Sequence, residues 1–164
     1  MFSKDDALTS AGLTESNSTF NAQFDDFIIN NIGREAAGSG ESWQLALNFK
    51  PADVTVRGPG QLRVTTGDSV LWALVTAGRP VVPLRLKGPP SARLNTAFTV
   101  FVLNGETRAP VPSVNVHANR GGGSWQTNDR GQATITLRAA GDYELRADSP
   151  GSYVRSNVLK VTVA

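Results

Sequence analysis

The side chains that most often carry catalysis are sparse in this sequence. His117 is the only histidine, and there is no cysteine. A Ser-His-Asp or Cys-His arrangement needs a histidine paired with a nucleophile, and a zinc site needs several histidines or thiolates. By strand alternation, His117 is expected to face outward beside Asn115 and Asn119. The sequence therefore predicts no catalytic residues, no disulfide and no metal site.

Adjacent carboxylates at Asp25 and Asp26 are the second chemical candidate. A glycosidase needs two carboxyls that face each other across a cleft, whereas neighbouring residues of a strand point to opposite faces. Calcium could recruit the pair together with Asp53 or Asp68, but no ligand-loop spacing supports such a site. We expect solvated turn carboxylates, and hydrolysis by this pair ranks below any binding function.

The three tryptophans are the candidate ligand contacts. Trp43 and Trp72 lie on the apolar faces of expected strands, where core packing is their ordinary role. Trp125 follows a glycine triplet at the end of a loop. An exposed indole there would suit stacking on a sugar or contact with a partner. The alternative is that Trp125 folds back over the core.

Charge and hydropathy narrow the classes of partner. The 164 residues include 16 basic and 14 acidic side chains, for a net charge of +2. The basic residues are scattered, whereas a nucleic-acid binder usually concentrates them on one face, so we expect no nucleic acid. No apolar run is long enough to cross a bilayer, so we expect no membrane insertion. The start, MFSKDDALTS, is too polar for a secretory leader, so we expect a chain that is cytosolic or whose leader has been removed.

The first half combines one expected helix with strands. Ser3 as N-cap, Asp6 three residues later and the stop at Gly12 predict a short helix over 3–11. Strands are expected over 27–32, 42–49 and 69–75. The prolines of RPVVPLRLKGPP restrict that segment to a linker or an edge strand. We place the domain boundary there, near Lys87 to Ala92, which gives domains 1–88 and 92–164.

The second half has a regular β pattern, with turn signals at the roughly 10–15 residue spacing of a small sandwich. The run AFTVFVL is apolar on both faces, so we expect it to be covered on both sides. The NDRG segment predicts a turn, with Gly131 suited to positive φ. Alternation predicts these inward-facing residues: Val114, Val116, Ala118, Ala133, Ile135, Leu137, Tyr143, Leu145, Ala147, Leu159, Val161 and Val163.

The segment GDY, placed before an alternating strand, resembles the tyrosine corner of Ig-like sandwiches. There a tyrosine at the start of a late strand hydrogen-bonds the upstream backbone. Leu145 then stands where an antibody domain has its second cysteine. Together VPSVNV, TNDRGQATITL, AGDYELRA and VRSNVLKVTV resemble the bacterial-type Ig-like domains of extracellular surface proteins, over about 92–164. The resemblance implies an antiparallel β-sandwich and no particular ligand.

The segments DDALTSAGL, FDDFIINNIG, SWQLALNF and VTTGDSVLWALV resemble the transcobalamin C-terminal-like domain, a β-grasp-like module of secreted proteins. Two departures stand out: the family usually has two strands before the helix, and many relatives carry cysteines. Absent first strands imply an open sheet edge. The segment RPVVPLRL, another protein chain, a second copy in a homodimer, or a segment upstream of this sequence could cover that edge.

The same resemblance names candidate ligand contacts in the first half. In the relatives, the segment matching SWQL contributes to corrinoid contact, which implicates Trp43 and Gln44. The helical partner domain of those corrinoid binders is missing here, so we expect no cobalamin and no cofactor.

These observations predict a mainly β protein: a small α+β, β-grasp-like domain with one short helix, then an Ig-like antiparallel β-sandwich. The function expected from them is that of a non-enzymatic structural or adhesive module, extracellular or at the cell surface. The alternative is a module that binds carbohydrate or another small ligand through Trp43, Gln44 and Trp125. A hydrolase is the third reading.

Overall fold

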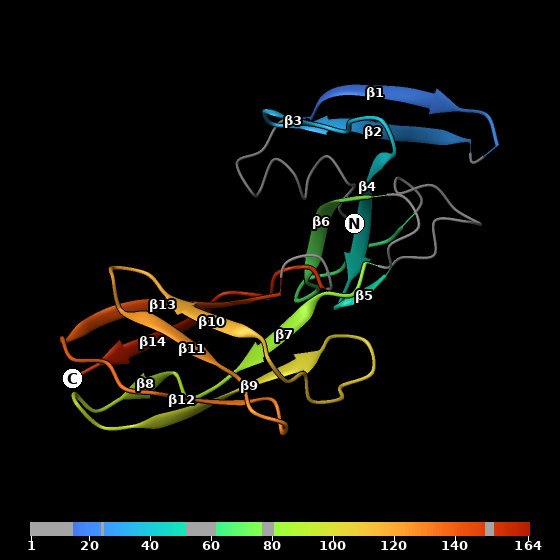
Figure 1. The fold of residues 1–164 in the computed structure, drawn as a ribbon. Coiled ribbons are helices and arrows are strands. Elements are labelled where there is room, and N and C mark those ends of the chain that lie inside the picture. Colours follow the sequence, from blue (N-terminus) through green and yellow to red (C-terminus); the bar gives the residue numbers. More distant parts are fainter. Residues whose placement is uncertain (1–14, 24, 52–61, 77–80, 150–152) are drawn as a thin grey trace. The chain divides into compact units, whose positions relative to one another are not determined.

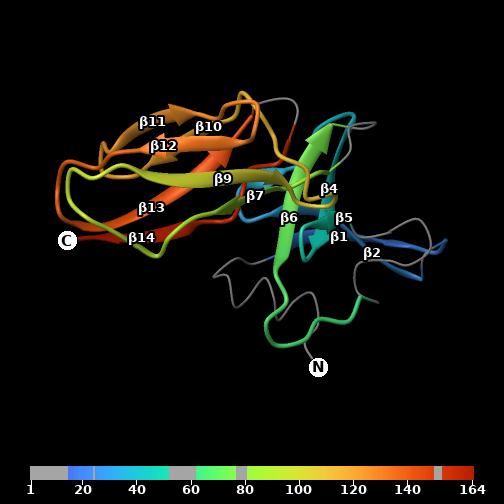
Figure 2. The same ribbon diagram turned by 90° about the horizontal axis from the view of Figure 1, so that it is seen from below.

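The computed structural model describes residues 15–23, 25–51, 62–76, 81–149 and 153–164. The described chain is mainly β, with strands arranged in four sheets and no helix (Figures 1 and 2). The helix predicted over 3–11 lies outside these residues. The chain divides into two compact units, Met1–Val81 and Val82–Ala164.

The first unit contains two small antiparallel sheets with the strand orders β1-β2-β3 and β5-β4-β6. The predicted strands over 27–32, 42–49 and 69–75 correspond to β2, β4 and β6. The sequence carries no strand signal for β1, because its residues are mostly polar and show no apolar alternation. The strands are β1 (Glu15–Asn21), β2 (Asp26–Ile32), β3 (Glu35–Ala36), β4 (Glu41–Leu47), β5 (Lys50–Pro51) and β6 (Val70–Thr76).

A shift in register between β1 and β2 shapes the core of the first unit. Ser18 pairs with Ile29, but Asn17 pairs with Asn31, so β2 carries one extra residue at this point. In a regular strand, residues three apart lie on opposite faces. The bulge reverses that alternation, and Ile29 and Ile32 are buried in the same cluster.

Hydrogen bonds link Asn48, which follows β4, to the turn that precedes β6. The Asp68 carboxylate accepts bonds from Asn48 Nδ2 (2.7 Å), Thr65 N (2.8 Å) and Thr65 Oγ1 (2.9 Å). Asn48 Oδ1 accepts from Ser69 N at 3.0 Å. These bonds hold the pKa of Asp68 below its usual value because they favour the charged carboxylate, and the bond from Asn48 has the largest effect. The turn thereby fixes the pairing of the two longest strands of its sheet.

The second unit has two sheets, with the strand orders β12-β9-β7 and β11-β10-β13-β14-β8. Its first strands, β7 and β8, are consecutive but belong to different sheets. A Cβ added at Gly88, between them, would lie 2.8 Å from the side chains of Val100 and Leu159, so the bend leaves no room for one. The strands are β7 (Leu84–Lys87), β8 (Ser91–Ala92), β9 (Phe98–Asn104), β10 (Asn115–Ala118), β11 (Gly123–Gln126), β12 (Gln132–Ile135), β13 (Gly141–Asp148) and β14 (Leu159–Val163).

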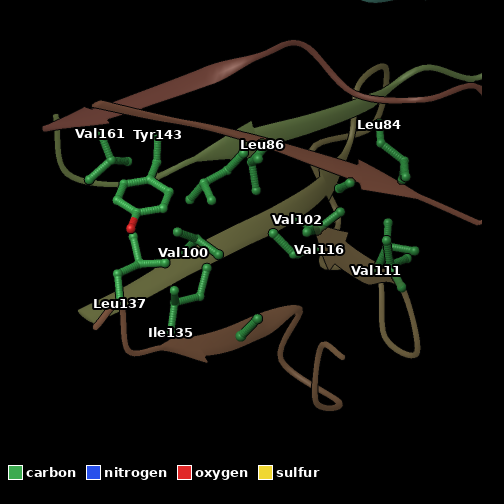
Figure 3. Close-up of a cluster of buried hydrophobic side chains, with 14 of the residues drawn as sticks. Leu84, Leu86, Val100, Val102, Val111, Val116, Ile135, Leu137, Tyr143 and Val161 are labelled. Atoms are coloured by element: carbon green, nitrogen blue, oxygen red, sulfur yellow. The ribbon is translucent and has the colours of Figure 1, made fainter. Parts of the chain in front are cut away.

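Side chains from both sheets of the second unit share one buried core (Figure 3). The predicted inward-facing residues are confirmed: ten are buried, and Ala118 and Leu159 pack against the core at its margin. The expectation for AFTVFVL was wrong. Val100 and Val102 are fully buried, but Thr99 and Phe101 are exposed. Only one face of the β12-β9-β7 sheet packs on the core, so β9 alternates between core and solvent.

The proline-containing segment forms an edge strand of the second unit. β7 pairs with β9, and its other edge is capped by Asn157, whose side-chain amide bonds the N–H and C=O of Leu86 at 3.0 and 3.2 Å. Leu84 N also donates to Val154 O at 2.9 Å. Because of these long-range bonds, the two units divide between Val81 and Val82, earlier than the expected boundary near 88–92. Among the described strands, β7 therefore pairs with β9 and extends neither sheet of the first unit.

Candidate functional site

The structure separates Trp43 from Gln44, although they are neighbours on β4. Trp43 pairs with Leu74 and Gln44 with Ala73, so their side chains project from opposite faces of the strand. The Trp43 indole packs against the buried pair Ile29 and Ile32. Gln44 is half-buried, and its Nε2 donates to Ser42 Oγ at 3.3 Å. The two residues do not form one ligand-binding surface.

Trp43 and Trp72 share the cluster around Ile29 and Ile32. Both are half-buried, and the indole nitrogens of both are buried without a hydrogen-bond partner in the described part of the chain. Large rings in such a cluster contribute mainly through the apolar area they remove from water. Their placement agrees with core packing as the ordinary role of these two residues.

Trp125 lies on β11, the edge strand of the five-stranded sheet, opposite Val116. It is half-buried and packs against the core of the second unit. Gly123 has a φ of 112°, and a Cβ there would lie 3.3 Å from the indole ring. The ring therefore lies back along its own strand, which is the arrangement expected if Trp125 covers the core.

The charged candidates lie in separate places. His117 Nε2 on β10 is 3.3 Å from Asp148 Oδ2 on β13, and both side chains are exposed. Asp25 is an exposed turn residue with a φ of 48°, and Asp26 begins β2. Within the described ranges, no three His, Asp, Glu or Cys side chains are close enough together to hold a metal ion. The contact between the exposed side chains of His117 and Asp148 is of a kind that contributes little to stability.

Tyr143 makes the hydrogen bond that the sequence predicts. Its hydroxyl donates to Ala139 O at 3.0 Å, four residues upstream, while its ring is buried. Figure 3 shows the ring among the core side chains near Val161 and Leu137. Leu145, two residues later, is fully buried. Both residues belong to the buried core of the second unit.

The NDRG turn also has the expected geometry. Gly131 has a φ of 67°, and a Cβ there would lie 2.6 Å from Val102 O. Asn128 Oδ1 accepts hydrogen bonds from Arg130 N and Gln132 N at 2.9 and 3.0 Å. The side chain of Asn128 thus satisfies the turn's backbone donors, as asparagine commonly does.

Among the residues that the structure describes, the most exposed aromatic side chains are Phe20 and Phe27, which the sequence did not single out. Phe20 on β1 and Phe27 on β2 pair across the hairpin with ring centroids 5.5 Å apart and planes at 69°. They are 53% and 47% exposed, respectively. The available signal was their symmetric placement on either side of the turn, which becomes visible only once β1 is known to be a strand.

Comparison of the chain with family models and with curated proteins finds no match. In the part that the structure describes, no helix has the length and apolar character needed to cross a membrane.

Proposed function

We propose that the second unit is an Ig-like β-sandwich that serves as a spacer in a non-enzymatic structural or adhesive protein of the cell surface. Three features support an Ig-like assignment. The first strand passes from one sheet to the other between β7 and β8, two sheets share one core, and Tyr143 bonds the backbone before its strand.

The observation that carries the spacer role is the direction of the first and last strands of the second unit. β8 and β14 pair in parallel, with Thr162 opposite Ser91 and Val163 opposite Ala92. Since the first and last strands run the same way, the start of β7 and the end of β14 lie at opposite ends of the unit (Figure 1). A module with its ends so placed adds its full length to a chain of domains.

For the first unit, the proposal keeps the β-grasp-like assignment suggested by the resemblance to transcobalamin C-terminal-like domains. The alternative function, binding of carbohydrate or another small ligand, stands second. Trp43 and Trp125 belong to different units and pack against their cores, and Gln44 lies on the opposite face of β4 from Trp43. These residues supply no single aromatic platform.

Force spectroscopy on the full chain tests the spacer role. The chain has no cysteine, so handles can be attached at Val82→Cys and Ala164→Cys. Pulling between them loads the β8–β14 hydrogen bonds in shear, and all of them must break together. Handles at Ala140→Cys and Ala164→Cys instead unzip the β13–β14 pair, in which Gly141 opposes Val163.

We expect a clearly higher unfolding force for the 82–164 geometry than for the 140–164 geometry. Equal forces would contradict a load-bearing spacer.

To test the alternative function, ligand binding, tryptophan fluorescence is followed while cell-wall polysaccharides are added. A saturable change that Trp125→Phe or Trp43→Phe abolishes would favour ligand binding over the spacer.

A further inference from the structure

The two units carry net charges of opposite sign. Residues 1–81 contain six basic and nine acidic side chains, a net charge of −3, whereas residues 82–164 contain ten and five, a net charge of +5. The overall value of +2 hides this division. Opposite fields on two parts of one chain favour contact between different parts of two copies.

An acidic aromatic surface lies at the end of the β1–β2 hairpin. We call Phe20, Asp25, Asp26 and Phe27 the hairpin tip. Every charged residue between 15 and 32 is acidic. The apolar face of β2 begins in the buried cluster at Ile29 and continues to Phe27, which pairs with Phe20 in solvent. An exposed aromatic pair that continues a core is typical of a surface that meets a partner.

A basic aromatic surface lies on the outer face of the β12-β9-β7 sheet. Phe101 is 40% exposed and sits between its cross-strand partners Lys87 and Gln132. We call these three residues the sheet face. The charged residues of the three strands are Arg85 and Lys87, and none is acidic. This surface therefore combines one exposed ring with positive charge.

We propose that the hairpin tip of one molecule docks on the sheet face of a second copy. The rings of Phe20 and Phe27 would meet that of Phe101, and Asp25 and Asp26 would face Lys87. The contact joins two different surfaces, so each bound copy keeps one free tip and one free face. Such a heterologous contact propagates into open chains or rings and does not stop at a symmetric dimer. This assembly goes beyond the spacer role, because it describes how copies would associate.

The first test measures the mass of the full chain by light scattering and sedimentation over a range of concentrations. The expected result is a mass that rises with concentration past that of a dimer. The mass falls again when salt is added, since the attraction between exposed charges is screened. If the chain stays monomeric at every concentration in low salt, the proposal is overturned. This holds even if the two surfaces bind a different protein.

The second test mixes two variants. One is the double variant Phe20→Ser/Phe27→Ser, which removes the aromatic rings of the hairpin tip. The other is Phe101→Ser, which removes the ring of the sheet face. Each variant alone is expected to remain monomeric, because every copy lacks the same half of the contact. An equimolar mixture is expected to form a heterodimer and stop there, since the one intact tip meets the one intact face.

Leu94→Ser is the matched control, because Leu94 is 39% exposed and lies outside both surfaces. It should associate as the unaltered chain does. Circular dichroism and thermal unfolding establish that each variant is folded. Self-association of either folded variant alone, or a mixture that stays monomeric, would overturn the proposal. The double variant Asp25→Lys/Asp26→Lys and the variant Lys87→Glu should each lose association when alone. A mixture of the two should associate again, because the reversed charges attract. If the mixture does not associate, the charged part of the proposed contact is wrong.

Discussion

The two units build their cores in different ways. The second unit buries a cluster of fifteen hydrophobic residues between its two sheets, and both sheets contribute to it. In the described part of the first unit, the hydrophobic cluster has two buried isoleucines with two half-buried tryptophans against them. Stability follows buried apolar area, so we expect the second unit to be the scaffold and the described part of the first unit to open more readily. Phe20 and Phe27, the most exposed aromatic side chains of the described residues, also lie on the first unit.

The largest effect is expected from Leu145→Ala in the second unit. Leu145 is fully buried on β13, and its truncation should lower the free energy of unfolding by about 2–5 kcal/mol. Urea unfolding followed by circular dichroism measures this loss. Leu94→Ala, at an exposed position, should change stability by less than about 0.5 kcal/mol. Similar losses for the two variants would mean that the shared core does not hold the second unit together.

A smaller effect is expected from Ile29→Ala in the first unit. Ile29 is buried against Trp43 and Trp72, and its loss should cost about 2 kcal/mol, near the low end for buried aliphatic residues. Tryptophan fluorescence reports this transition directly, because two of the three indoles lie in the cluster. If Ile29→Ala destabilised the chain as much as Leu145→Ala, the contrast between the units would be wrong.

Tyr143→Phe isolates one hydrogen bond of the second unit. The change removes the bond to Ala139 O and keeps the buried ring. We expect a loss of about 0.5–1.5 kcal/mol, measured by thermal or urea unfolding. The same change at Tyr153, which is half-buried at the margin of the core, is the control. If Tyr153→Phe lowered the free energy of unfolding as much or more, the hydrogen bond from Tyr143 to Ala139 O would add no specific stability.

The smallest effect concerns pH and the first unit. The pKa of Asp68 is held below its ordinary value of 3.8 by bonds from Asn48 and Thr65. Its contribution to stability is therefore present at pH values above 3.8 and is lost as the pH falls through the lower, folded-state pKa. Asp68→Asn should flatten the decrease in melting temperature of the first unit below that value. Asp129 is an exposed turn residue of the second unit, so Asp129→Asn should leave this decrease unchanged. If both variants gave the same profile of melting temperature against pH, the stabilising role assigned to Asp68 would be contradicted.

Much of the second unit could be predicted from the sequence because its signals are local. Strand alternation identified Val116, Ile135 and Leu145 as inward residues, and the NDRG turn and the Tyr143 bond depend on residues close in sequence. Long-range pairing was less accessible. The pairing of β7 with β9 moved the boundary between the units to Val81 and Val82, and the composition of RPVVPLRL does not reveal which sheet it joins.

The candidate ligand contacts were less predictable than the core. Residue type selected Trp43, Gln44 and Trp125. However, Trp43 and Gln44 are neighbours on a strand and face opposite ways, and the indole of Trp125 packs against the apolar core. The exposed pair Phe20 and Phe27 went unnoticed because β1 has polar residues and carries no periodic signal of its own. Its strand conformation depends on pairing with β2, which is a tertiary effect.

Amide hydrogen exchange on the unmodified full chain tests the contrast between the units most directly. We expect the slowest exchange in β9, β10, β13 and β14, which open only when the second unit unfolds as a whole. The amides of β1 and β2 should exchange much sooner. Protection of β1 and β2 equal to that of β13 would contradict the division into a firm scaffold and a more readily opened, interacting first unit.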